Sequence, residues 1–293
     1  MHLVTFWVAS FVIAGKAPMD AAYRKLLTYS YNILGSFEDA KDVVQDVMEK
    51  YIHLDKTKIE NEVHYLTRMV INHSINFKNK FGKQAAYGVW LPEPVSTETA
   101  ETHLIREQVA HYTLLVLMET LNAKERAVYM LREAFNYSHE EIAAALDITS
   151  DSARQLYSRA KKSLSQYVPT AQYHHRDKLP QYIDAVVNAD MKTLENLLAG
   201  DIKIMADGGN KIRVVKDIEM GAASTAQLVQ HVYALFLEDK QYTFTQINHQ
   251  PAICFWQNKR LYNCQVFSFD EAGKMKFIYS VVDPDKLKSI KFI

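Results

Sequence analysis

The apolar positions of residues 21–83 follow the helical period of 3.6 residues. They divide into three stretches, and the pair Gly35 and Ser36 ends the first of them. The second stretch covers 40–51 and leaves a polar face outward, and the third covers 65–80. We therefore expect three helices. The apolar stripes are Tyr23, Leu26, Leu27 and Tyr31 in the first helix and Ala40, Val43, Val44, Val47, Met48 and Tyr51 in the second.

A second helical pattern, at residues 121–165, predicts two short helices joined by a tight turn. Ser138 and Glu141 have the spacing of a capping box at the start of the first helix. The turn follows at 147–149, and we expect Ser150 to cap the second helix. That helix has an apolar side and an opposite polar, basic side. The apolar side holds Ala153, Leu156, Tyr157, Ala160 and Leu164, and the polar side holds Asp151, Arg154, Gln155, Ser158, Arg159 and Lys162.

The second of these helices has the features of a recognition helix. Its apolar residues would hold it on the scaffold, while Arg, Gln, Ser and Lys side chains would reach base edges and phosphates in a major groove. The alternative is an ordinary amphipathic helix pair with a solvated basic face. Asp147 stands where such turns usually carry glycine, and it tolerates left-handed backbone better than most residues do.

The pattern changes after residue 167. A helix is expected at 179–198, followed by segments rich in β-branched and aromatic residues, with another helix at 227–237. This order favours an α+β domain in which a curved antiparallel sheet closes over a helix. The expected strands are 202–205, 211–215, 242–247, 252–256, 261–269 and 276–282.

Length and charge narrow the function classes. The 293 residues suffice for two or three domains, and a hydrophobic content of 48% fits folded cores. A net charge of zero excludes a globally basic nucleic-acid coat. Residues 63–92 nevertheless contain no acidic side chain, so this segment can form a phosphate-facing patch or simply a solvated basic face. Its basic residues are Arg68, Lys78, Lys80 and Lys83.

The cysteines and the first residues bear on the compartment. Only Cys254 and Cys264 are present, so we expect a reduced, cytoplasmic protein in which both thiols fill the core of paired strands. The first 15 residues are apolar but shorter than the roughly 20 residues that a spanning helix needs. We expect no membrane segment there, and Met19 is an alternative start.

Three short motifs make a family resemblance specific: WLPEPV at 90–95, DGGNK at 207–211 and DPDKL at 283–287. Together with the segments at 23–52, 65–80 and 121–164, they resemble the sigma-70 family of transcription initiation factors. The resemblance is to its extracytoplasmic-function class, in the subgroup with a fused C-terminal SnoaL-like domain. It covers nearly the whole chain from Met19. Departures are Asn210 for a glycine, Asp283 for an asparagine, and Tyr65 at a start that is usually rich in tryptophan.

The resemblance implies a multidomain fold. It consists of two all-α sigma domains, the second with a helix-turn-helix, and a C-terminal α+β SnoaL-like domain shaped as a cone. We expect the first sigma domain (region 2) at 19–84, a linker at 85–110, the second sigma domain (region 4) at 111–166, and the SnoaL-like domain at 175–293.

The resemblance also implies a function, which is to direct core RNA polymerase to promoters without catalysis, cofactor or metal. Region 2 would bind the β′ clamp helices of the polymerase, whose β subunit is a further partner, and both sigma domains would bind promoter DNA. The polymerase-binding residues would be Asp42, Gln45, Asp46 and Glu49. The DNA-binding residues would be Asn72, Asn76, Lys78 and Lys80 at the −10 element, and Ser152, Arg154, Gln155, Ser158, Arg159 and Lys162 at the −35 element. A regulatory contact between linker and C-terminal domain would use Trp90, Leu91, Pro92, Asp207, Gly208, Gly209, Lys211, Asp285 and Lys286.

Two other readings of the C-terminal domain stay open. Some SnoaL-like relatives are cyclases or isomerases, and the candidate acid–base residues here are Asp207, His231 and His249. No spacing among these three implies proximity. Alternatively, the cone binds an unidentified small ligand without converting it.

Overall fold

The computed structural model describes residues 16–81, 86–98, 104–165, 175–214, 218–219 and 221–291. The chain divides into two compact units. Unit 1 contains residues up to 81, with 101–109 and 121–163, and unit 2 contains 82–100, 110–120 and 164–293. The expectations for the first 15 residues, Lys83 and Val215 concern residues outside the described part.

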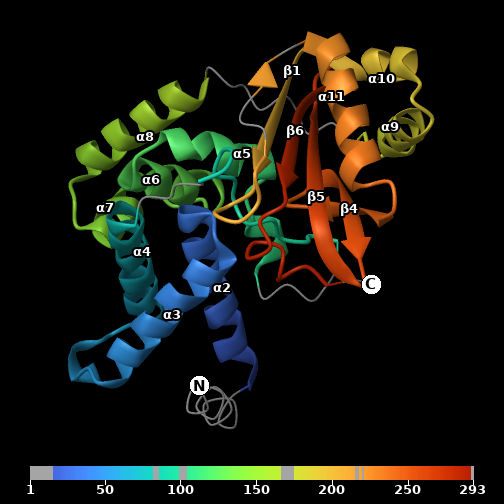
Figure 1. Ribbon diagram of the computed structural model, residues 1–293. Helices are drawn as coiled ribbons and strands as arrows, with labels where there is room; N and C mark the ends of the chain where they lie inside the picture. Colours follow the sequence, from blue (N-terminus) through green and yellow to red (C-terminus); the bar gives the residue numbers. More distant parts are fainter. Residues whose placement is uncertain are drawn as a thin grey trace. The chain divides into compact units, whose positions relative to one another are not determined.

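Unit 1 consists of helices packed side by side (Figure 1). The three helices expected near the N-terminus and the two expected at 121–165 are all present, so these predictions are confirmed. The bounds are α2 (Lys16–Leu34), α3 (Phe37–Ile52), α4 (Glu62–Lys80), α6 (Ala123–Glu133), α7 (His139–Leu146) and α8 (Ser150–Ser165), with short 3-10 turns at Lys56–Lys58 and Arg106–Gln108.

The units cut across the expected domains. The helices at 19–84 and those at 121–164 share one hydrophobic core instead of forming separate cores. Apolar residues of α2 and α4 pack against apolar residues of α6 and α7. One core therefore buries the apolar sides of all four helices. The core residues are Tyr29, Ile33, Ile71, Ile75, Ala123, Ala127, Val128, Leu131, Ile142, Ala143, Leu146 and Ala153.

Unit 2 is built on a six-stranded sheet with the strand order β2-β1-β6-β5-β4-β3. The strands from β3 to β6 form the expected antiparallel meander. The bounds are β1 (Leu198–Asp207), β2 (Ile218–Glu219), β3 (Gln241–Ile247), β4 (Gln250–Gln257), β5 (Arg260–Phe269) and β6 (Met275–Val281), with helices α5 (Tyr112–Leu117), α9 (Lys178–Val187), α10 (Met191–Leu197) and α11 (Gly221–Phe236) and a 3-10 turn at Met118–Thr120.

Both faces of this sheet are covered. The helices α9, α10 and α11 pack on one face around Tyr182, Phe255 and Phe267 (Figure 1). The other face packs against Leu91 of the linker and Tyr112 of α5. Strand β4 is therefore buried on both sides along most of its length, which is typical of a strand in the middle of a three-layer arrangement.

Three sequence expectations for unit 2 need correction. Residues 211–214 form a turn and irregular backbone, not a strand, because Gly208 and Gly209 end β1 in a tight turn. The sheet is not wholly antiparallel, since β1 pairs in parallel with β6. The helix expected at 179–198 is two helices, interrupted where Ala189 adopts a positive φ of 52°.

The prediction that both thiols fill the core of paired strands is confirmed. Cys254 and Cys264 are direct partners across β4 and β5, both are fully buried, and both are free thiols with their sulfur atoms 3.9 Å apart.

Candidate nucleic-acid interface and linker latch

The helix-turn-helix forms as its sequence predicts. Ser138 Oγ accepts from the Glu141 amide at 3.1 Å, and a Glu141 carboxylate oxygen accepts from the Ser138 amide at 2.7 Å, which completes the capping box. Asp147 ends α7 in the left-handed conformation, with φ 56°. The cap of α8 differs from the prediction: Thr149 Oγ1 accepts from the Ser152 amide at 3.1 Å, whereas the Ser150 hydroxyl donates to Glu140 at 3.0 Å.

The two sides of α8 separate as expected. Ala153, Ala160 and Leu164 are buried, and Leu156 and Tyr157 are half-buried. Among the candidate DNA-binding residues of α8, Ser152 alone is half-buried, and its hydroxyl lies 2.8 Å from that of Thr149. The exposed candidates on this helix are Arg154, Gln155, Ser158, Arg159 and Lys162.

The two arginines of this face are held by acidic side chains of unit 1. The Arg154 guanidinium donates to Asp151 at 2.9 Å and to Glu140 of α7 at 3.0 Å. Arg159 Nε donates to Glu125 of α6 at 3.0 Å. The arginine side chains are more than half exposed, so these pairs are weak and a phosphate or base can replace them at little cost.

The candidate −10 residues on α4 lie in different environments. Asn76 and Lys80 are exposed, Lys78 is half-buried, and the Lys80 ammonium lies 5.0 Å from the centre of the Phe81 ring. Asn72 is half-buried, and its amide donates to the carbonyl oxygen of Ala145 in α7 at 2.9 Å. The four candidates therefore do not form one free surface in this structure.

The candidate polymerase surface is an outward face of α3. Val43, Val44 and Val47 are buried on the opposite side of this helix. Burial, followed by the neighbouring carboxylates Asp39, Glu38 and Asp46, raises the pKa of Asp42 above its usual value. Asp46 also lies 3.4 Å from His73 of α4. The exposed residues of the face are Asp42, Gln45, Asp46 and Glu49.

The WLPEPV, DGGNK and DPDKL motifs meet at the C-terminal end of β1, in a cluster that we call the linker latch and that centres on Asp207. Asp207 is fully buried. One carboxylate oxygen accepts from the Leu91 amide at 2.7 Å, and the other accepts from the Gly209 amide at 2.8 Å. A buried carboxylate thus holds the linker backbone on one side and its own turn on the other.

The cation of the linker latch is Lys286. Its ammonium donates to the Asp207 carboxylate and to the Leu91 carbonyl oxygen, the latter at 2.6 Å, and it lies 4.3 Å from the centre of the Trp90 ring. Burial lowers the pKa of Lys286 below its usual value, and the carboxylates of Asp207, Asp283 and Glu93 oppose this shift. Such a position combines an ion pair with a cation–π contact in a desolvated setting.

Backbone pairing and two glycines complete the linker latch. The linker runs along the end of β1, where the Val89 amide donates to Ala206 at 2.9 Å and the Gly208 amide donates to Tyr87 at 3.1 Å. A Cβ on Gly208 would lie 1.7 Å from the Ile212 carbonyl oxygen. Gly209 has φ 58°, and a Cβ there would lie 2.2 Å from the Asp283 carboxylate. Glycine is therefore required at positions 208 and 209, because other parts of the chain approach both backbone positions too closely to leave room for a side chain.

The other candidate residues of this contact lie at its edge. Lys211 and Asp285 form an exposed ion pair of 2.7 Å, which contributes little to stability. The Pro92 carbonyl oxygen accepts from the hydroxyl of Tyr112 in α5 at 2.7 Å. The linker contact thus extends to the first helix of the region 4 segment.

Sequence reasoning missed Asn248, which holds two distant segments. Its amide oxygen accepts from the Val95 amide at 3.0 Å, and its amide nitrogen donates to the Ala110 carbonyl oxygen at 3.1 Å. Its backbone pairs with Val95 and Tyr112 as well. Asn248 is fully buried and has φ 47°, in the two-residue turn between β3 and β4. Asparagine in such a turn is a hairpin signal, but nothing local indicates its partners.

The acid–base candidates do not come together. Asp207 is at the end of β1 and His249 follows β3. Because β6, β5 and β4 lie between these two strands, four strand spacings of about 4.8 Å separate them, roughly 19 Å in all. His231 is exposed on α11, and His249 lies 5.0 Å from His111, ring centre to ring centre.

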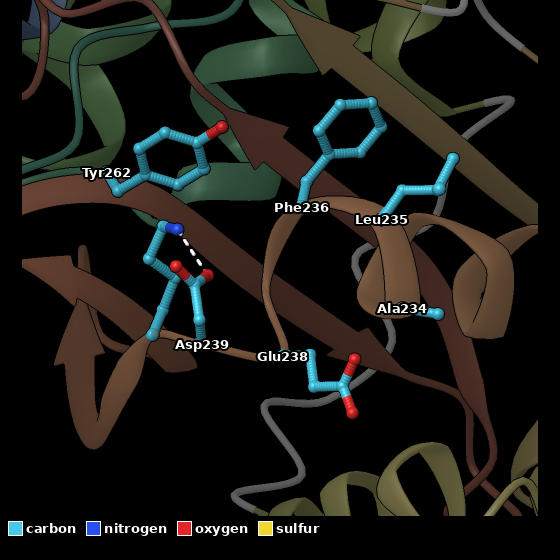
Figure 2. Close-up of a pocket in the computed structure, with 7 residues that line it drawn as sticks. Ala234, Leu235, Phe236, Glu238, Asp239 and Tyr262 are labelled. Carbon is cyan, nitrogen blue, oxygen red and sulfur yellow. Dashed lines mark hydrogen bonds and ion pairs between the residues drawn. The ribbon is translucent and has the colours of Figure 1, made fainter.

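A hollow of about 350 Å³ opens on unit 2 at the end of α11 (Figure 2). The charge of its lysine is already paired, since the Lys240 ammonium pairs with Asp239 and lies 4.9 Å from the centre of the Tyr262 ring. None of the three acid–base candidates lines it. The lining residues are Ala234, Leu235, Phe236, Glu238, Asp239, Lys240 and Tyr262.

Among the described residues, no helix combines the length and the apolar character needed to cross a bilayer.

A capped helix pair with an exposed basic face on its second helix defines a DNA-binding protein of the helix-turn-helix class. Residues 112–164 match the family described as sigma-70, region 4. The ECF RNA polymerase sigma factor SigJ of Mycobacterium tuberculosis is 26% identical over 202 residues, which cover 66% of this chain and 64% of that factor, less than two thirds of its length. The probable ECF RNA polymerase sigma factor SigI of the same organism is 22% identical over 94% of this chain and 96% of its own.

The fold agrees with these matches. The crystal structure of M. tuberculosis SigJ superposes with a TM-score of 0.76 at 21% identity, covering 94% of this chain and 99% of that one. Residues 112–164 thus match the region 4 model of the sigma-70 family, and the chain is similar over most of its length to extracytoplasmic-function sigma factors, with an α+β domain in unit 2.

Proposed function

We propose that the protein directs core RNA polymerase to promoters and that its C-terminal domain controls this activity through the linker latch. The observation that carries the first part is α8, whose buried stripe fixes it on the scaffold while Arg154, Gln155, Ser158 and Arg159 face solvent. Long polar side chains on one exposed helix face match the hydrogen-bonding pattern of base edges in a major groove.

Alanine at Arg154 or Arg159 should reduce transcription from a promoter that the unmodified protein recognises, while polymerase binding survives. A contact to a base should cost about 1–3 kcal/mol and relax the preference at one base pair, whereas a phosphate contact should weaken all sequences alike and lower the salt dependence. Binding to a promoter library at several salt concentrations separates the two.

Lys161→Ala is the matched control for these variants, because Lys161 is an exposed cation of α8 outside the proposed reading set. Normal transcription by both arginine variants would show that α8 does not read the −35 element.

The polymerase surface is proposed on the exposed carboxylates of α3. Reversing charge with Asp46→Lys and Glu49→Lys should weaken co-purification with core polymerase several-fold, because the proposed partner surface complements the acidic face of α3 and would then meet like charges. The measurement is a pull-down with purified core enzyme. Glu271→Lys, which reverses one charge at an exposed site of unit 2, is the control for each of the two single variants. Undiminished binding by the double variant would exclude this face.

The regulatory part rests on the linker latch. The segment between the two DNA-reading parts is held by Asp207, Lys286 and Asn248, all of unit 2, so the C-terminal domain fixes the path of that segment. A tethered contact of this kind acts at an effective concentration of roughly millimolar whatever the amount of protein. We propose this role in place of a catalytic one. The Lys286 replacement described in the Discussion tests it.

A further inference from the structure

Two cysteines face each other across adjacent strands of the sheet in unit 2. Cys254 of β4 and Cys264 of β5 are direct register partners, and their sulfur atoms are 3.9 Å apart. Directly opposite residues of an antiparallel pair have Cα atoms about 4.5–5.5 Å apart. A disulfide usually spans about 4.4–6.8 Å between Cα atoms. The two thiols can therefore join in a disulfide without a rearrangement of their strands.

The thiols lie in the same cross-strand row as the carboxylate of the linker latch. The register places Cys254, Cys264, Val281 and Asp207 beside one another on β4, β5, β6 and β1. Neighbouring strands are about 4.8 Å apart, so Cys264 and Asp207 are separated by roughly 10 Å along this row. Side chains of direct partners point to the same face of a sheet. Both thiols are therefore on the face that the linker covers.

The linker contributes to the burial of the thiols. The core on this face of the sheet contains Cys254 and Cys264, together with Leu91 of the linker, Tyr112 of α5 and Leu287 of the C-terminal segment. Both thiols are fully buried in it. Because Leu91 comes from a segment outside the sheet, its departure would remove part of the cover over the two thiols.

While the linker is in place, the pair is protected from oxidation. The hydrogen bond from Cys254, followed by burial, raises the pKa of the Cys264 thiol well above its usual value. The thiolate is the reactive form of cysteine, and an oxidant must also reach the sulfur. Burial therefore opposes both the loss of the proton and the approach of an oxidant.

We propose that Cys254 and Cys264 are a modification site, which a hydroperoxide converts to a disulfide when the linker leaves the sheet. One thiolate attacks a peroxide oxygen, which gives a sulfenic acid and releases water or an alcohol. The other thiol attacks the sulfenic sulfur, which forms the S–S bond and releases water. The two thiols lose two electrons and two protons in total, and the hydroperoxide takes up both.

This inference deepens the regulatory part of the proposed function and rests on it. The linker latch then controls a chemical step as well as the path of the linker, since oxidation is confined to molecules in which Leu91 has left the sheet. Thiols that respond to oxidants are usually accessible. Here the accessibility depends on the linker.

Oxidation of the purified full-length protein by hydrogen peroxide tests the site. Lys286→Met, which removes the cation of the linker latch, should raise the rate of disulfide formation at least about tenfold, because the reaction follows the population of the opened state. Mass spectrometry of non-reduced peptides detects the bond between positions 254 and 264, and dithiothreitol should reverse it. Lys288→Met, the exposed control, should react at the rate of the unmodified protein.

Leu194→Ala separates departure of the linker from unfolding of the whole unit. Leu194 is fully buried in the core on the other face of the sheet, so alanine there lowers the stability of unit 2 without touching the linker. At matched stability, measured by urea unfolding, Lys286→Met should oxidise faster than Leu194→Ala. Equal rates would show that the thiols react only after unit 2 unfolds, and would overturn the proposal.

A second result also overturns it. If folded Lys286→Met shows faster hydrogen exchange at Leu91 but forms no disulfide, departure of the linker does not make the thiols reactive. All these rates are measured without polymerase or DNA. Failure of the transcription tests would therefore count against the proposed function and leave the rates unchanged, so the two proposals can fail separately.

Discussion

Lys286→Met is expected to destabilise unit 2 by about 3–5 kcal/mol, because it leaves the fully buried Asp207 carboxylate without its counter-charge. Methionine retains an unbranched apolar chain beside Trp90, so the loss of the charge is the main change. The Leu91 amide, which donates to Asp207, should then exchange its hydrogen faster. Hydrogen exchange of a peptide that spans the linker measures this, together with urea unfolding of the full chain.

Lys288→Met is the matched control, since Lys288 pairs with Asp285 at an exposed site and its loss should change stability by about 0.5 kcal/mol or less. Adding Asp207→Asn to Lys286→Met removes both charges and should restore part of the lost stability. An equal effect of Lys286→Met and Lys288→Met would mean that the buried pair does not hold the linker.

The same variant tests regulation. If the linker latch fixes the chain between the DNA-reading parts, Lys286→Met should broaden the range of promoter spacer lengths that support transcription. Promoters with graded spacers give this readout at a temperature at which the variant remains folded. If hydrogen exchange at Leu91 becomes faster but the range of usable spacer lengths does not change, the linker latch does not control promoter selection.

The spacing of apolar and capping residues predicted most helices and strands of this fold, because each element depends mainly on residues close together in the sequence. The stripe of Ala153, Ala160 and Leu164 indicates both the helix and its buried side, and the Ser138–Glu141 spacing indicates where the preceding helix begins. The paired cysteines followed from strand-forming segments in the same way. In these cases a few adjacent residues determine the answer.

Pairings between distant segments could not be predicted from the pattern. The helical pattern at 65–80 predicted α4, but it did not show that α6 and α7 bury Ile71, since any apolar surface could cover that residue. The parallel pairing of β1 with β6 depends on the path of the chain between the two strands. The residues of β1 and β6 themselves do not indicate that path. The motifs around Asp207 indicated the linker latch through resemblance, whereas Asn248 carried no motif.

Asn248→Ala should cost about 3–8 kcal/mol in the stability of unit 2. It removes the acceptor of the Val95 amide and the donor to the Ala110 carbonyl, and each buried group left unpaired costs about 1–3 kcal/mol. Alanine in the left-handed conformation at φ 47° adds about 1–2 kcal/mol. Glycine at the same position should cost less than alanine by that conformational part, because it adopts positive φ freely. Urea unfolding of the full chain is the measurement.

Asn258→Ala separates backbone strain from the loss of the two hydrogen bonds. Asn258 has φ 50° in the turn between β4 and β5, and its side chain is exposed, so alanine there should cost only the conformational part. The stability lost in Asn248→Ala, minus that lost in Asn258→Ala, then measures how strongly the Asn248 side chain holds Val95 and Ala110 in place. Because those two residues lie at opposite ends of the segment between the DNA-reading parts, Asn248→Ala should speed hydrogen exchange at both 95 and 112 together. Faster exchange at one of them alone would show that Asn248 holds the two segments independently and does not couple them.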